Sequence, residues 1–237
     1  GDQPFVHLLS MVVEYARERL SDDAVPGTVV PSALAPTAEW LLDRLVTVSS
    51  DALYEEFELF RSGRDEATEE SAEATAAPDE DAESPTDQYD QFVDAMFGRG
   101  FANLGLRYPV LARLVVTLVE QWVAFVESFC RRLREDRGRL SDRFGVDPDS
   151  AVASLRPLAG DTHGGGASPL RVTFEDDADV VYKPRSVATE RAFHDVLDRL
   201  SDYDSVPDFR SPAFETDDGY GWMEWVSRFD PPTEAAV

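Results

Sequence analysis

The chain has 237 residues, of which 43% are hydrophobic, and it carries a formal net charge of −25 with a pI of about 4.3. This length and apolar content suffice for one large or two modest cores, and the acidity argues against non-specific binding to nucleic acid or to an anionic membrane. The single cysteine, Cys130, excludes an internal disulfide framework and a multi-cysteine zinc site.

The basic residues are almost all arginines: Lys183 is the only lysine beside 21 arginines. An acidic excess with almost no lysine suits a halophilic protein in a salt-rich cytoplasm, where screening weakens self-repulsion. The alternative is a genome that favours arginine codons together with one acidic linker, which explains the missing lysines better than the acid excess. We expect a cytoplasmic protein and a piece of a longer chain.

The N-terminal region, residues 1–64, has the apolar periodicity of helices. Residues 1–20 predict an amphipathic helix with either Tyr15 or Ala16 completing its inner face, and residues 37–62 predict one or two further helices. The apolar residues expected to face inward are Phe5, Leu8, Leu9, Val12, Val13, Trp40, Leu41, Leu45, Leu53 and Phe57.

Residues 65–87 interrupt this pattern. They contain ten Asp or Glu, no basic residue and no large apolar side chain. Such a segment cannot bury enough surface to offset the entropy of ordering it, so we predict a disordered acidic insert.

A second helical region is expected over residues 88–158. Its longest apolar run extends from Pro109 to about Arg137, with apolar residues every three or four positions. Charged residues such as Arg113 and Glu120 interrupt the run, which favours a core helix over a membrane span. Cys130 within it is interpreted as a buried helical thiol.

The period changes to two from residue 168. Residues 170–174 and 179–183 predict two strands joined by a polar turn, and residues 187–200 predict a helix that Ser186 can cap. The inner face expected for that helix comprises Phe193, Val196, Leu197 and Leu200. Two short strands, around 211–216 and 220–227, end the pattern.

Pairing the first two strands as a hairpin places Phe174 near Asp179 and Lys183 near Leu170, a few residues beyond Gly166. Glycines leave backbone N–H groups free to surround a phosphate, and an ammonium beside them adds a point charge. Pro184 removes the next donor of the ladder and ends the strand. The spacing therefore predicts a site for nucleotide phosphates.

Other phosphate and metal motifs fit less well. The chain has no "GK[ST]" sequence, and its glycines precede a strand instead of opening a helix. The "DTH" stretch offers two metal ligands without an evident third. A kinase catalytic loop needs a nearby Asn for its metal, and the only Asn in the chain is Asn103.

Four segments, "GDTHGGG", "VVYKPRS", "ERAFHDVLDRL" and "YGWMEWV", resemble in that order the dehydratase domain of class II lanthipeptide synthetases. The helical segment from residue 108 to 140 is similar to the same family, so that the resemblance covers roughly residues 88–226. It implies ATP- and magnesium-dependent phosphorylation of Ser and Thr in a precursor peptide. Elimination of phosphate, a far better leaving group than hydroxide, then forms dehydroalanine or dehydrobutyrine.

The resemblance also implies roles for single residues. Lys183 would hold a nucleotide or phosphopeptide phosphate, and Arg185 would add a second cation. Glu190 would pair with Lys183, as in protein kinases. Asp161 and His163 match the family's functional loop, where they would act either in phosphorylation or in elimination. The catalytic residues predicted are thus Asp161, His163 and Lys183, and the nucleotide-binding residues predicted are Gly164, Gly165, Gly166, Lys183, Arg185 and Glu190.

Simpler interpretations stay open for these residues. Lys183 could be a surface lysine, Asp161 and His163 could cap a loop, and Glu190 could be a solvated acid of the first helical turn. Arg185 suits a surface ion pair as well as a phosphate.

The fold class expected is α+β: a helical N-terminal region followed by an incomplete kinase-like small lobe (residues 159–237) with an antiparallel sheet. The catalytic loop and metal-binding acid of the family are missing, so we expect no turnover of peptide by this chain alone, and a separately encoded C-terminal half is a candidate partner. The alternative function is a non-catalytic nucleotide- or peptide-binding module.

Overall fold

The computed structural model describes residues 5–21, 24–72, 85–158, 164–201, 203, 207 and 209–227. The chain divides into two compact units. The helical unit comprises Gly1–Arg19 and Glu39–Val123, and the sheet unit comprises Leu20–Ala38 and Ala124–Val237.

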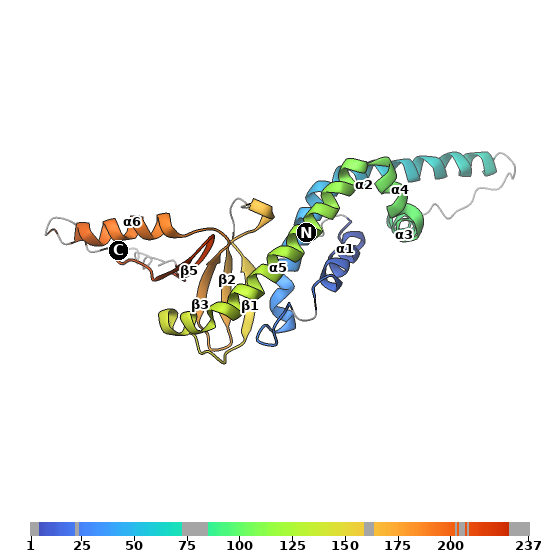
Figure 1. The fold of residues 1–237 in the computed structure, drawn as a ribbon. Helices are drawn as coiled ribbons and strands as arrows, with labels where there is room; N and C mark the ends of the chain where they lie inside the picture. Colours follow the sequence, from blue (N-terminus) through green and yellow to red (C-terminus); the bar gives the residue numbers. More distant parts are fainter. Residues whose placement is uncertain are drawn as a thin grey trace, which may run out of the picture. The chain divides into compact units, whose positions relative to one another are not determined.

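The helices of the helical unit are coloured blue to green in Figure 1. Two of them, α2 and α5, continue into the sheet unit. The elements are α1 (Val6–Glu18), α2 (Ala35–Ala72), α3 (Pro85–Ala95), the π-helical turn η2 (Met96–Gly100), α4 (Phe101–Arg107) and α5 (Pro109–Phe144). The residues 37–62, predicted as one or two helices, lie within the single helix α2.

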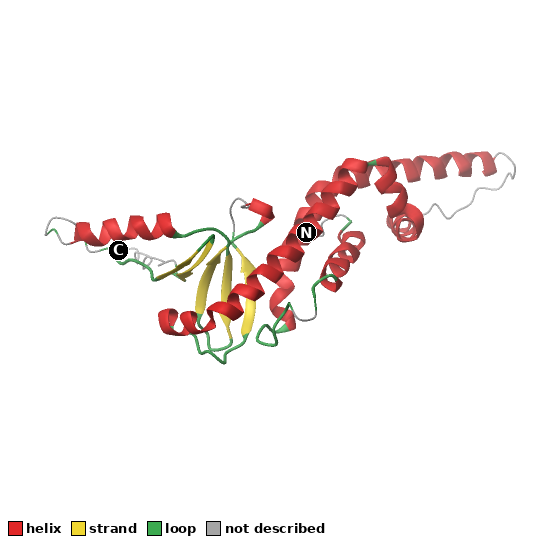
Figure 2. Ribbon diagram, viewed as in Figure 1, coloured by secondary structure: helices red, strands yellow, loops and turns green. Residues whose placement is uncertain are grey.

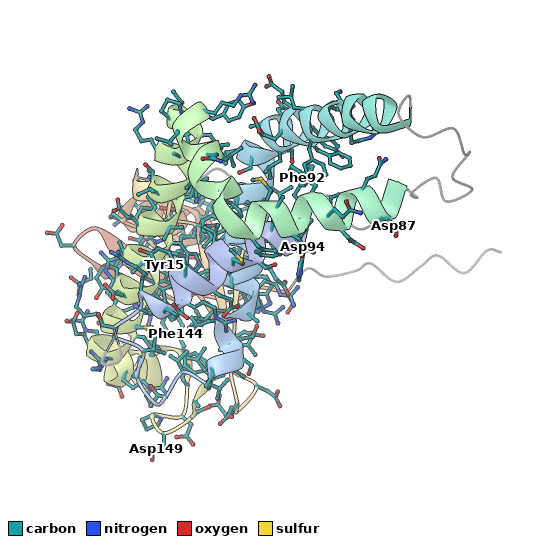
Figure 3. All side chains as sticks on the ribbon, turned by 90° about the vertical axis from the view of Figure 1, so that its right-hand side faces the viewer. Tyr15, Asp87, Phe92, Asp94, Phe144 and Asp149 are labelled. Carbon is teal, nitrogen blue, oxygen red and sulfur yellow. The ribbon has the colours of Figure 1, made fainter. Side chains whose placement is uncertain are left out.

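Helix α1 buries the face that its periodicity predicts. Leu8, Leu9 and Val13 are buried, and Ala16 completes the stripe. Tyr15 is 53% exposed and lies on the outer side of the helix (Figure 3). The alternative between Tyr15 and Ala16 is thereby decided for Ala16.

An aromatic cluster joins α2 to α3. Phe92 of α3 lies between the two helices (Figure 3), with its ring centroid 5.3 Å from Phe57 and 5.7 Å from Phe60. Edge-on contacts of this kind stabilise the packing beyond the effect of the area that the rings bury. The cluster holds the C-terminal half of α3 against the middle of α2.

The predicted acidic insert is wrong at both ends. Helix α2 continues to Ala72, and α3 begins at Pro85, so that part of 65–87 is helical. A helix anchored by its apolar half propagates readily through Glu and Ala, and proline is well placed in a first turn. Residues 73–84 lie outside the described residues.

The sheet unit contains one antiparallel five-stranded sheet, shown in yellow in Figure 2, with the order β1-β2-β3-β5-β4. Its helix α6 (Ala188–Ser201) lies in the chain between the third and fourth strands. The strands are β1 (Val152–Pro157), β2 (Leu170–Phe174), β3 (Asp179–Lys183), β4 (Phe214–Asp217) and β5 (Tyr220–Glu224). The α+β class predicted from the sequence is confirmed.

Strand β1 corrects the prediction of a helical region over 88–158. It pairs with β2, and its register shifts between Val152 and Ser154. This irregularity breaks the alternation of buried and exposed residues on which recognition of a strand depends. The sequence pattern therefore does not indicate a strand here.

The β2–β3 hairpin forms with a register one residue from that predicted. Thr173, not Phe174, lies opposite Asp179, and Leu170 lies opposite Tyr182. The N–H of Phe174 donates to Ala178 O, and Asp177 adopts a positive φ of 63°. A three-residue loop with a left-handed last residue closes the hairpin in this register.

The C-terminal half of α5 lies against one face of the sheet (Figure 1), where Phe129 contacts Tyr182 and Trp222. Cys130 is fully buried, as predicted, and burial raises the pKa of its thiol to about 12. Among the described helices, α5 is long and apolar enough to cross a membrane by length and composition alone. In the sheet unit, the helix carries buried side chains such as Phe129 and Leu133.

Helix α6 does not bury the face that its periodicity predicts. Phe193 is 60% exposed, and Val196 and Leu200 are also exposed. The side that approaches the sheet carries Glu190, which pairs with Lys183, and His194, whose ring lies 5.4 Å from that of Phe214. The polar contacts of the helix, and not its apolar stripe, set its orientation.

Candidate phosphate-binding site

Lys183 is the last residue of β3 and lies opposite Gly221 of β5. Because side chains alternate along a strand, it faces away from Tyr182 and therefore away from α5. Its side chain is only 16% exposed. The unique lysine is thus held at the sheet and is not an ordinary surface lysine.

Glu190, in the first turn of α6, binds this lysine. Its Oε1 lies 3.3 Å from Lys183 Nζ and 2.6 Å from Arg185 Nη2. Glu190 is 24% exposed, and its Oε2 is buried without a hydrogen-bond partner among the described residues. The predicted pairing of Lys183 with Glu190 is confirmed, and Arg185 joins the same carboxylate.

The two cations decide the protonation of Glu190. Burial alone would raise the pKa of this carboxyl, but hydrogen bonds from Arg185, from its own backbone and from Lys183, together with the lysine charge, lower the pKa to about 2. The carboxylate is therefore ionised at neutral pH, and the cluster keeps one positive charge in excess.

A close backbone contact positions α6 for this pairing. A Cβ atom on Gly221 would lie 2.4 Å from Val187 Cγ2 and 3.0 Å from the backbone oxygen of Glu215. Val187, buried directly before α6, therefore fits only over a residue without a side chain. Gly221 thus permits the approach that brings Glu190 within reach of Lys183.

The glycine turn Gly164–Gly166 lies before β2, at the end of the sheet where β3 runs out toward α6 (Figure 1). Gly165 and Gly166 have φ values of 74° and 73°, which side chains disfavour. Leu158 precedes the turn in the chain, and its N–H donates to the carbonyl oxygen of Pro169, which follows the turn. The glycines and Lys183 thus share one end of the sheet, as the hairpin argument predicts.

Asp161 and His163, the other predicted catalytic residues, lie outside the described residues. Within the part of the chain that the structure describes, no group of three or more His, Cys, Asp or Glu is arranged to hold a metal ion.

A second polar cluster on the same face of the sheet escaped the sequence analysis. Arg171 forms a two-pronged ion pair with Asp179, at 3.0 and 2.6 Å, and Thr173 donates to the same carboxylate at 2.6 Å. The guanidinium also lies 4.5 Å from the ring centroid of Trp225. Polar residues at alternate positions of both hairpin strands were the available signal.

The family model described as a domain of unknown function (DUF4135) matches residues 108–237, more than half of the chain. The chain belongs to the DUF4135 family. No curated protein matches it. The DUF4135 segment contains the whole of α5, the whole sheet, and the Lys183–Glu190 pair. DUF4135 is associated with lanthipeptide synthetases, so the segment is a lanthipeptide-synthetase-related domain.

Proposed function

We propose that the DUF4135 segment is the nucleotide-binding part of a lanthipeptide dehydratase, which phosphorylates Ser and Thr of a precursor peptide with ATP and then eliminates phosphate. The observation that supports this most is the ion pair between Lys183 and Glu190, 3.3 Å long and largely buried. Protein kinases use a lysine on a sheet strand and a glutamate on the following helix in the same way.

The ion pair gives Lys183 a defined position before any ligand binds. A flexible lysine would lose side-chain entropy on meeting a phosphate, whereas Glu190 has already ordered this one. Because Arg185 binds the same carboxylate, the ammonium keeps capacity for an anion. The lysine would thus orient a phosphate and offset its charge.

The residues present fit a nucleotide phosphate. Lys183 and Arg185 would neutralise its charge, and the backbone of the glycine turn Gly164–Gly166 would donate hydrogen bonds. ATP, when bound, supplies the phosphoryl group that turns a poor leaving group into a good one. For magnesium, the described residues offer no group of three or more His, Cys, Asp or Glu side chains that could hold the ion.

The partners that follow from this proposal are the precursor peptide and a separately encoded C-terminal half that completes the catalytic machinery. The negative net charge is consistent with a soluble, cytoplasmic protein that binds neither nucleic acid nor membrane.

Amine labelling tests the phosphate site directly, because Lys183 is the only lysine. An acylating reagent applied to the folded chain labels Lys183 and the N-terminal amine, and peptide mass spectrometry quantifies each. We expect millimolar ATP or inorganic triphosphate to slow labelling of Lys183 about tenfold, and adenosine to leave it unchanged.

The N-terminal amine is the internal control, since its labelling should not respond to ATP. Glu190→Gln is the matched variant: it should speed labelling of Lys183 in the free protein. Equal labelling of Lys183 with and without ATP would overturn the phosphate role.

Co-expression with a precursor peptide separates the full reaction from simple binding. Loss of water or a phosphate adduct on the peptide would support dehydration. Protection of Lys183 by ATP with an unmodified peptide, even when a candidate C-terminal half is co-expressed, would instead favour a non-catalytic nucleotide-binding module.

A further inference from the structure

The helical unit contains an apolar cavity of about 190 Å³ that is separate from the lysine site. Four helices contribute to its wall. The lining residues are Leu9 and Val12 of α1, Ser49 of α2, Phe101, Leu104 and Gly105 of α4, and Leu111, Ala112, Val115 and Val116 of α5.

Small residues leave this space open. A Cβ atom on Gly105 would lie 3.7 Å from Ala112 Cβ, an ordinary contact distance, so α4 and α5 approach closely without large side chains between them. Val116 lines the cavity and is half exposed, which marks an apolar mouth toward solvent.

Ser49 is the only polar side chain in this wall. It is 1% exposed, and its Oγ has no hydrogen-bond partner among the described residues. Thr47 and Ser50 of the same helix donate to the carbonyl oxygens four residues before them. A buried hydroxyl without a partner is costly and rare, so its presence in a ligand-sized cavity is informative.

We propose that this cavity binds a phenol-type group, an aromatic ring with one polar atom at its end, and that Ser49 forms a hydrogen bond with that atom. Apolar cavities of about 150 Å³ admit benzene, so the volume here accommodates a ring with one or two further atoms. The apolar wall accepts the ring, and the single hydroxyl selects its polar end. The group can come from a free phenol or from the tyrosine side chain of a peptide.

Titration of the full chain with p-cresol and with toluene tests the assignment, because the two differ by one hydroxyl. We expect p-cresol to bind at least about fivefold more tightly than toluene. Ser49→Ala should remove that preference and leave toluene binding within about twofold. Ser50→Ala is the matched control, since Ser50 donates to Val46 O and does not line the cavity.

A second variant protects the test against indirect effects. Ala112→Leu fills the cavity and should abolish binding of both compounds while the far-ultraviolet circular dichroism spectrum stays unchanged. Binding of N-acetyl-tyrosinamide in competition with p-cresol would identify a peptide side chain as a source, and binding of p-cresol alone a free phenol. Equal affinity for p-cresol and toluene, or binding of neither, would overturn the proposal.

Discussion

Glu190 is an acid whose ionised state is built into the fold. Its pKa of about 2 results from Arg185, its own backbone and Lys183, which together outweigh the opposing effect of burial. The folded-state pKa is below the unfolded value of about 4.5, so the stability from this group is present above pH 4.5 and is lost as the pH falls toward 2.

Glu190→Gln should therefore lower the free energy of unfolding by about 1–3 kcal/mol at neutral pH. Between about pH 4.5 and pH 2 the difference from the parent protein should shrink, because protonation removes the same charge from the parent. Urea unfolding at several pH values measures both effects. Glu175→Gln, in the exposed hairpin turn, is the control, and a difference independent of pH would contradict the assignment.

Asp136 is a second buried acid, and its hydrogen bonds connect helix α5 to the sheet. It is fully buried on α5, and its Oδ2 accepts hydrogen bonds from Tyr220 Oη at 2.7 Å and Trp222 Nε1 at 2.8 Å. The Arg139 guanidinium lies 3.3 Å from its other oxygen. These contacts fasten α5 to β5, the strand that also carries Gly221.

At the scale of elements, the orientation of α6 decides the site. The helix carries an apolar stripe, yet it turns Glu190 and His194 toward the sheet and leaves Phe193 exposed. The contact of Val187 with Gly221 and the ion pair at Lys183 explain this choice. A hydrophobic pattern identifies a helix but does not state which neighbour its faces meet.

Gly221→Ala should displace the beginning of α6. The new methyl group would overlap Val187, so we expect a loss of about 1–3 kcal/mol in stability and faster amine labelling of Lys183. Thermal unfolding and the labelling rate provide the two readouts.

Val187→Ala in the same chain should restore part of both effects, since it vacates the space. Gly138→Ala in α5, where a Cβ meets nothing within 4 Å, is the control and should stabilise the helix slightly. A Gly221→Ala protein with unchanged stability would argue against the close approach.

At the scale of the whole molecule, the net charge of −25 governs how stability depends on salt. Like charges repel in the compact state, and the Debye length falls from about 10 Å at 0.1 M salt to about 3 Å at 1 M. Stability should therefore rise with salt.

We expect the thermal midpoint to increase by roughly 5 °C between about 0.1 M and 1 M sodium chloride. Replacing the five acids of residues 73–84 by Asn or Gln changes the net charge from −25 to −20. This weaker repulsion should reduce the rise of the thermal midpoint with salt. Chloride is preferable to sulfate, which strengthens hydrophobic burial by itself. A midpoint that falls with salt would contradict the role of repulsion.

The sequence by itself determined the features that depend on neighbouring residues. The alternation in β2 and β3, the presence of a polar turn between them and the helix after Lys183 are all short-range patterns. The hairpin register, which differs by one residue from the predicted one, is not. Lys183 and Glu190 are seven positions apart, so a strand end and a first helical turn suffice to predict their pairing.

Only the tertiary structure decided what depends on distant partners. It showed β1, the exposed stripe on α6, the burial of Asp136 and the cavity at Ser49. Each of these depends on contacts between residues far apart in the chain, about which local periodicity contains no information. The sequence pattern therefore predicts most helices and strands, whereas side-chain packing between distant residues decides which of their faces are buried.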